Sequence, residues 1–344
     1  MVAPNLDRPP DIDPDAASSA PERRCRDRGS GAAARYDRGV RIVSLVPSAT
    51  EILFALGLGD AVVAVSHECD YPAEAAERPR ITASEIATDR LSNREIEDAV
   101  AARLHDGRPL YRIDAEALRA LEPTLLITQS LCDVCALPVQ AVHHALRLLT
   151  RTPAIVSLDA TTVDGVLQSI VTIGEATTTA AAAHAIVADL RTRLDRVRDA
   201  VSTAPPRRVL CLEWLDPPYQ CGHWIAEMVR LAGGTDAASR PGIPSVATTW
   251  DELCETNPEL VVAFPCGCSV DRTVAEVENL RARGVWPSRL HNTPLVIADS
   301  RYFTRPGPRI VDGVELLASV LHPDRVTWVP HTADGNTSMS RVSI

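Results

Sequence analysis

Residues 41–51 read RIVSLVPSATE and join a short apolar run to the start of a helix. Residues 41–46 are mostly apolar and predict a buried strand. Residues 48–56 predict a helix that is capped near Ser48 and ends at Gly57. Because a strand that leads directly into a helix is typical of a parallel α/β unit, this stretch decides the expected fold class.

The same alternation continues along the rest of the chain. Further strands are predicted at residues 61–65, 124–128, 154–158, 209–212, 260–264 and 295–298. Further helices are predicted at residues 114–121, 138–149, 223–232, 270–283 and 313–321. Strands that alternate with helices imply parallel sheets, and a chain of 344 residues is long enough for about two domains. We therefore expect an α/β fold with two similar halves.

One long segment separates the two halves. Residues 162–201 contain no proline and only two glycines, and apolar residues recur along them with a helical period. A helix of ~40 residues would be about 60 Å long, so it would have to run between lobes. The predicted organisation is a disordered leader at 1–39, an N-terminal α/β lobe at 40–160, a linking helix at 161–203, a C-terminal α/β lobe at 207–325 and an irregular tail at 326–344.

Composition narrows the classes of protein. Hydrophobic residues make up 45% and charged residues 23%, which is ordinary for a globular protein. The formal net charge of −10 argues against a nucleic-acid partner, because such a partner requires a basic face. No apolar run approaches the ~20 residues of a membrane-spanning helix, so we expect no transmembrane segment.

The leader and the cysteine count bear on location. Residues 1–39 contain no apolar stretch like the core of a secretory signal. The nine cysteines are an odd number, which suits reduced thiols better than a disulfide framework. Both observations favour a cytoplasmic protein. The alternative is an extracytoplasmic protein whose true start lies upstream.

Cysteine and histidine side chains gather in loops that follow predicted strands. In open parallel α/β sheets, ligands bind outside the carboxyl ends of the strands. Thiol and imidazole groups there indicate a metal ion, a metal-containing ligand or thiol chemistry. If the two halves face each other, these groups converge on one site with His67 or His223; otherwise they are separate reduced thiols that line a pocket. The predicted metal ligands are Cys69, Cys132, Cys135, Cys266 and Cys268.

Four motifs carry a resemblance to a known family. They are Ile42–Glu51 followed by Leu56-Gly57, Ile113-Asp114 leading to Leu125–Ile127, Trp214–Pro217 leading to Gly233-Gly234, and Tyr302 leading through Arg305–Arg309 to Asp312-Gly313. Together they resemble the cobalamin and iron-siderophore class of substrate-binding proteins, over roughly residues 41–324. The resemblance implies two Rossmann-like lobes joined by a single long helix, with a ligand cleft between the lobes. The loops at 129–135 and 266–268 further resemble a cobalamin-binding-like subgroup without export signals.

The resemblance implies a binding protein for a cobalamin-like corrinoid or another metal chelate. Such a protein is the substrate-binding component of an ABC importer, so an ABC permease is the expected partner. The cofactor stays open: cobalamin as the ligand, or a zinc or iron ion at the Cys and His loops. The alternative is a cytosolic metal-dependent or thiol-dependent enzyme that uses Cys132, Cys135, Cys266 and His67. We assign no catalytic residue, because no pair of carboxyl groups has the spacing of a general acid and base.

Candidate ligand-binding residues are polar or aromatic side chains in these motifs and loops. The aromatic rings offer flat surfaces for a macrocycle, or else ordinary packing. His223 is either the lower axial partner of a corrinoid or a helix cap. Arg305 suits a phosphate or carboxylate of the ligand, whereas Arg309 near Asp312 reads equally as part of a structural pair. The candidates are Ser48, Thr50, His67, Tyr71, Gln129, Trp214, His223, Trp224, Tyr302 and Arg305.

Overall fold

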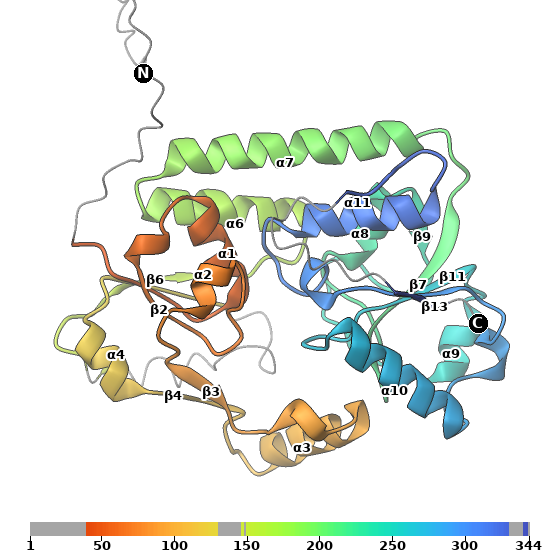
Figure 1. Cartoon of the computed structure of the whole chain (residues 1–344), viewed down its shortest axis with the longest axis horizontal. Coiled ribbons are helices and arrows are strands. Elements are labelled where there is room, and N and C mark those ends of the chain that lie inside the picture. The colour runs from red at the N-terminus through yellow and green to blue at the C-terminus, as the bar shows by residue number, and fades with distance from the viewer. Residues whose placement is uncertain (1–38, 130–145, 148, 330–339, 343–344) are drawn as a thin grey trace, which may run out of the picture. The chain divides into compact units, whose positions relative to one another are not determined.

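The computed structural model describes residues 39–129, 146–147, 149–329 and 340–342 (Figure 1). Cys132, Cys135, nearly all of the predicted leader and most of the predicted helix at 138–149 lie outside these residues. The statements below concern the described residues alone.

The N-terminal lobe is built on a parallel sheet in the order β2-β1-β5-β6. Its strands are β1 (Ile42–Ser44), β2 (Val62–Val65), β5 (Leu125–Thr128) and β6 (Ala154–Ser157). The predicted strand and helix at the start of the chain are confirmed, since α1 (Pro47–Ala55) follows β1 directly, but the N-cap residue is Val46 and Ser48 lies inside the first turn. This helix begins slightly earlier than predicted, because Pro47 in its first turn needs no hydrogen-bond acceptor for an N–H.

The C-terminal lobe is built on a larger mixed sheet. Its centre is parallel and contains β9 (Gly234–Asp236), β7 (Arg207–Leu215), β11 (Leu260–Ala263) and β12 (Leu295–Ile297). Its antiparallel members are β8 (Pro218–Gln220), β10 (Val246–Ala247) and β13 (Ser340–Val342). Strand β13 lies in the tail that was predicted as irregular, and it is ordered by its pairing with β12. The α/β fold class with two lobes is confirmed; the predicted domain boundaries stay a prediction.

The remaining helices cover these sheets or connect their strands. The helices of the C-terminal lobe are α8 (Ile225–Leu231), α9 (Trp250–Glu255), α10 (Val270–Ala282) and α11 (Ile310–Leu321). Those of the N-terminal lobe include α2 (Ala73–Ala76) and α4 (Ala115–Leu121). Short 3-10 turns lie at Gly59–Ala61, Thr88–Arg90, Ser288–Leu290 and Ser300–Tyr302.

The linking segment differs from the single helix of about 40 residues that its period predicts. It forms two helices, α6 (Val163–Ala176) and α7 (Ala180–Val201), that pack side by side (Figure 1). The chain reverses near Thr178, whose φ is 58°, and close approach is possible because Gly174 has no side chain. Both helices bury one apolar face, so the helical period does not reveal the break. Helix α7 leads into the C-terminal lobe and packs against α8 and α11.

A small excursion of the N-terminal lobe was not predicted. It consists of an antiparallel pair, β3 (Thr82–Ser84) and β4 (Tyr111–Ile113), with α3 (Asn93–His105) between the two strands. Ser92 and Glu95 form a capping box that begins α3. Arg94 on α3 donates to Asp216 of the C-terminal lobe at 2.6 Å, so this helix reaches across to the other lobe.

A buried ion pair joins the two lobes. Glu51 on α1 accepts two hydrogen bonds from Arg309 at the start of α11, one of them from Nε at 2.9 Å. Burial alone would lower the pKa of Arg309, but the hydrogen bond and charge of Glu51 raise it above its ordinary value. The guanidinium also lies 4.0 Å from the centre of the Tyr71 ring. Asp312, the expected structural partner of Arg309, instead accepts from Arg193.

We predict that Arg309→Gln lowers the free energy of unfolding by about 3–5 kcal/mol, because it leaves the Glu51 carboxylate buried without its main partner. The double variant Glu51→Gln/Arg309→Gln should lose less, since no unpaired charge stays buried. Urea denaturation measures both. In the exposed pair with Asp164, Arg191→Gln is the control, and equal losses in control and test variants would contradict the prediction.

Candidate ligand-binding site

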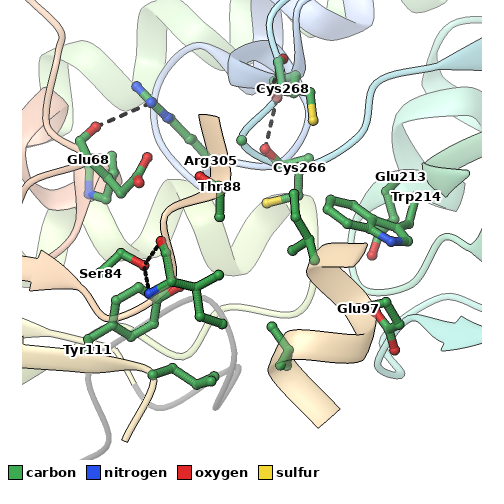
Figure 2. Close-up of a pocket in the computed structure, with 18 of the residues that line it drawn as sticks. Glu68, Ser84, Thr88, Glu97, Tyr111, Glu213, Trp214, Cys266, Cys268 and Arg305 are labelled. Carbon is green, nitrogen blue, oxygen red and sulfur yellow. Dashed lines mark hydrogen bonds between the residues drawn. The ribbon is translucent and has the colours of Figure 1, made fainter. Parts of the chain in front are cut away.

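A cavity of about 300 Å³ lies between the two lobes (Figure 2). Pro47 and Ser48 begin α1 just after β1, whereas Glu68 and Gln129 lie in loops after β2 and β5. Residues 266–268 follow β11, and residues 300 and 304–306 follow β12. The position agrees with the rule that ligands of parallel sheets bind beyond the carboxyl ends of strands. Its remaining lining residues are Ser84, Ile86, Thr88, Ile96, Glu97, Val100, Leu110, Tyr111, Glu213, Trp214 and Arg272.

The unpredicted excursion supplies the apolar wall of this cavity. Ile96 and Val100 lie four residues apart on α3, so they share one face of the helix. Leu110 and Tyr111 at β4 continue the wall, while Glu97 accepts a hydrogen bond from Tyr219 at 2.9 Å. The serine and glutamate of the capping box, followed by this apolar spacing, were the sequence signal that could have identified the helix.

The loop after β11 presents two thiols in different environments. Gly267 has a φ of 71° and makes the tight turn between Cys266 and Cys268. Cys266 is exposed, whereas Cys268 is buried with its sulfur 3.9 Å from the Asn93 amide nitrogen. Burial raises the pKa of Cys268. Cys266 is therefore the thiol of this loop that a ligand in the cavity can reach.

Two other predicted site residues lie in the core of the N-terminal lobe. The Thr50 hydroxyl lies within hydrogen-bond distance of the Ser44 hydroxyl, at 2.8 Å, and of the Cys69 sulfur, at 3.0 Å. Burial raises the pKa of Cys69, which favours the neutral thiol over a thiolate ligand. Neither residue lines the cavity.

His67 also stays outside the cavity lining. Its Nδ1 lies 2.7 Å from the Thr82 hydroxyl, and burial lowers its pKa. Among the residues that the structure describes, no group of three or more Cys, His, Asp and Glu side chains is placed to hold a metal ion. Cys132 and Cys135 lie outside those residues, so the predicted convergence with them stays a prediction.

Most of the predicted aromatic candidates serve packing. Trp224 and Tyr302 are buried, and the Trp224 indole donates to the Phe303 carbonyl at 2.7 Å. Tyr71 packs on Arg309, and half-buried His223 stacks on Trp224, with burial lowering its pKa. Of the aromatic candidates, Trp214 is the one that lines the cavity (Figure 2).

The polar side of the cavity contains Ser48, Gln129 and Arg305. The Ser48 hydroxyl is buried without a hydrogen-bond partner among the described residues, so it remains available to a ligand. Arg305 donates to Asp70 of the opposite lobe and lies 3.7 Å from Glu51. Burial opposes ionisation of Asp70, but the hydrogen bond and charge of Arg305 hold its pKa below the ordinary value.

Two lobes joined at one side, with a cavity at the facing ends of their sheets, define the class of two-lobed binding proteins. The profile of the periplasmic binding protein family matches residues 42–275, and the chain belongs to that family.

Relatives agree with this membership. The chain is 24% identical to the vitamin B12-binding protein of Vibrio cholerae over 284 residues, which cover 82% of this chain and 88% of the relative. It is 26% identical to the cobalamin-binding protein of Halobacterium salinarum over 295 residues, which cover 82% and 69%. The crystal structure of a periplasmic heme-binding protein from Pseudomonas aeruginosa shares the fold, with a TM-score of 0.64 at 19% identity over 84% of this chain and 95% of the other.

The predicted cytoplasmic location is wrong. The chain belongs to the periplasmic binding protein family, and proteins of that family work outside the cytoplasm. Within the described residues, none of the helices is long and apolar enough to cross a membrane.

We predict that Asp70→Asn makes the free energy of unfolding less dependent on pH under acid conditions. The pKa of Asp70 is lower in the folded protein than in the unfolded chain. Its contribution to the free energy of unfolding is therefore present above the unfolded pKa and is lost as the pH falls through the folded pKa. The wild type should therefore lose more free energy of unfolding than the variant between about pH 5 and pH 2. Thermal and urea unfolding across this range measure the difference. Asp60→Asn is the exposed control, and parallel curves for wild type and Asp70→Asn would refute the assignment.

We also predict that Cys266 is the fastest of the described cysteines to react with a maleimide in the folded, reduced protein, because the others are buried. Peptide mapping after brief labelling measures this order. Cys254 is the buried control and should label only after unfolding; equal labelling of the two would contradict the structure.

Proposed function

We propose that this protein binds a metal-containing macrocycle, most suitably a corrinoid, in the cavity between its lobes and delivers it to an ABC permease. The observation that carries the proposal is the mixed lining of one interlobe cavity, with an apolar wall from α3, an aromatic ring from β7 and polar groups around them. A macrocycle with polar arms requires these three kinds of surface. The names of the B12-binding, cobalamin-binding and heme-binding relatives support the same ligand class.

The charges of the lining favour a corrinoid over a heme. Both arginines of the described lining are already bonded: Arg305 to Asp70, and Arg272 to the carbonyl oxygens of Thr88 and Leu91. These contacts occupy part of the guanidinium donors that the carboxylates of a heme would use. Amide arms suit the carboxylates of Glu68 and Glu97, because a carboxylate has about four acceptor sites and the hydrogen bond from Tyr219 occupies one of them on Glu97.

The predicted site residues that line the cavity have different roles in this proposal. Trp214 supplies a ring for stacking, Ser48 and Gln129 supply hydrogen bonds, and Cys266 supplies the accessible sulfur for the ligand's metal. Membership in a binding-protein family favours binding over catalysis, so we infer that the protein is not an enzyme. The permease partner follows from the resemblance to ABC importer components.

We predict that purified full-length protein binds cyanocobalamin at micromolar concentration and binds hemin more weakly. Trp214→Ala should raise the Kd for cyanocobalamin about tenfold or more, because a flat stacking surface is lost. Tryptophan fluorescence quenching and the corrin absorption band measure binding.

Trp250→Phe is the matched control, since Trp250 packs on Trp286 and does not line the cavity. Its Kd should equal that of the wild type. Tighter binding of hemin would overturn the preference for a corrinoid, and failure to bind either compound would overturn the function.

A further inference from the structure

Two buried cysteines outside the cavity face each other across a hairpin. Strands β7 and β8 are antiparallel, with Leu212 paired to Gln220. If this register is continued by one step, it places Cys211 of β7 opposite Cys221, the residue after β8. The thiols are free in the structure.

Both side chains point to the same face of the sheet. Cys211 and Cys221 belong to the large apolar cluster that also contains Val209, whereas Leu210 and Leu212 belong to the cluster on the other face. Directly opposite residues of antiparallel strands have Cβ atoms about 4.5–5.5 Å apart, and a disulfide requires roughly 3.5–4.5 Å. A small movement of the hairpin therefore brings the two sulfurs to bonding distance.

The corrected location changes the chemistry expected of this pair. Disulfides form and persist outside the cytoplasm and are rare within it. The odd cysteine count favoured reduced thiols and a cytoplasmic protein, but family membership contradicts that location. Cys211 and Cys221 are therefore an opposed pair in a protein that works in an oxidising compartment.

We propose that Cys211 and Cys221 form a cross-strand disulfide that closes the β7–β8 hairpin. The two thiols lose two protons and two electrons to the disulfide of a thiol–disulfide oxidant, which becomes a dithiol. Because both cysteines are almost fully buried, the bond forms while the chain folds.

The bond would hold the segment that carries the C-terminal side of the cavity. Glu213 and Trp214, which line the cavity, lie between the two cysteines. So do Asp216, the partner of Arg94, and Tyr219, the partner of Glu97. A disulfide at the base of the hairpin therefore restrains both the stacking ring and the contacts to α3.

The sequence provides a direct test. Trypsin releases residues 209–230 as one peptide, because no lysine or arginine lies between Arg208 and Arg230. Acid cleavage of the Asp216–Pro217 bond then separates the two cysteines. The full chain is refolded with reduced and oxidised glutathione, alkylated under denaturing conditions and digested.

The expected peptide is lighter than the reduced form by two hydrogen atoms, carries no alkyl group and stays joined after acid cleavage until it is reduced. Cys254, buried alone on α9, is the control and should be alkylated. In Cys211→Ser, Cys221 should be alkylated as well. Recovery of the wild-type peptide with both thiols alkylated, or with Cys221 bonded to any other cysteine, would overturn the proposal; the wild-type result does not depend on whether the variant folds.

Discussion

The buried pair between Glu51 and Arg309 is the interaction on which the arrangement of the lobes depends. It joins the first helix of one lobe to the last helix of the other, and both side chains are almost fully buried. A buried charge is strongly destabilising when its partner is absent. The pair therefore favours the arrangement in which α1 and the start of α11 lie next to each other. The neighbouring ion pair between Arg305 and Asp70 is a second contact that holds the two lobes together. Together they bring the carboxyl ends of the two sheets to opposite sides of one cavity.

The cavity follows from that arrangement. Loops after parallel strands carry the polar groups, as the topology requires, while α3 closes the cavity with an apolar wall and bonds to the other lobe through Arg94. The large apolar cluster continues from the N-terminal lobe through α6 and α7 into α8 and α11. The lobes therefore share a core on one side and line a cavity on the other.

Part of this site was predictable from residues alone. Ser48, Gln129 and Trp214 are polar or aromatic residues that come shortly after predicted strands, and they line the cavity. Thr50 and Cys69 also come after predicted strands, but their side chains point into the core, where the Thr50 hydroxyl lies 3.0 Å from the Cys69 sulfur. The sequence of such a segment does not indicate which of its side chains point into the core and which line the cavity. Arg305 was chosen for its charge, and its partner Asp70 is more than two hundred residues away in the chain.

The α/β class, the two lobes and the resemblance to the family could be predicted from residues alone, because strand and helix periods and motif order are local properties of the chain. The fold-back of the linking segment at Thr178, the apolar wall formed by α3, and the pairing of Arg309 with Glu51 instead of Asp312 became evident from the folded structure. Each of these outcomes depends on contacts between residues distant in the chain. A helical period or a motif shows which face of a helix or strand is apolar. Packing in the folded protein determines which other element that face contacts.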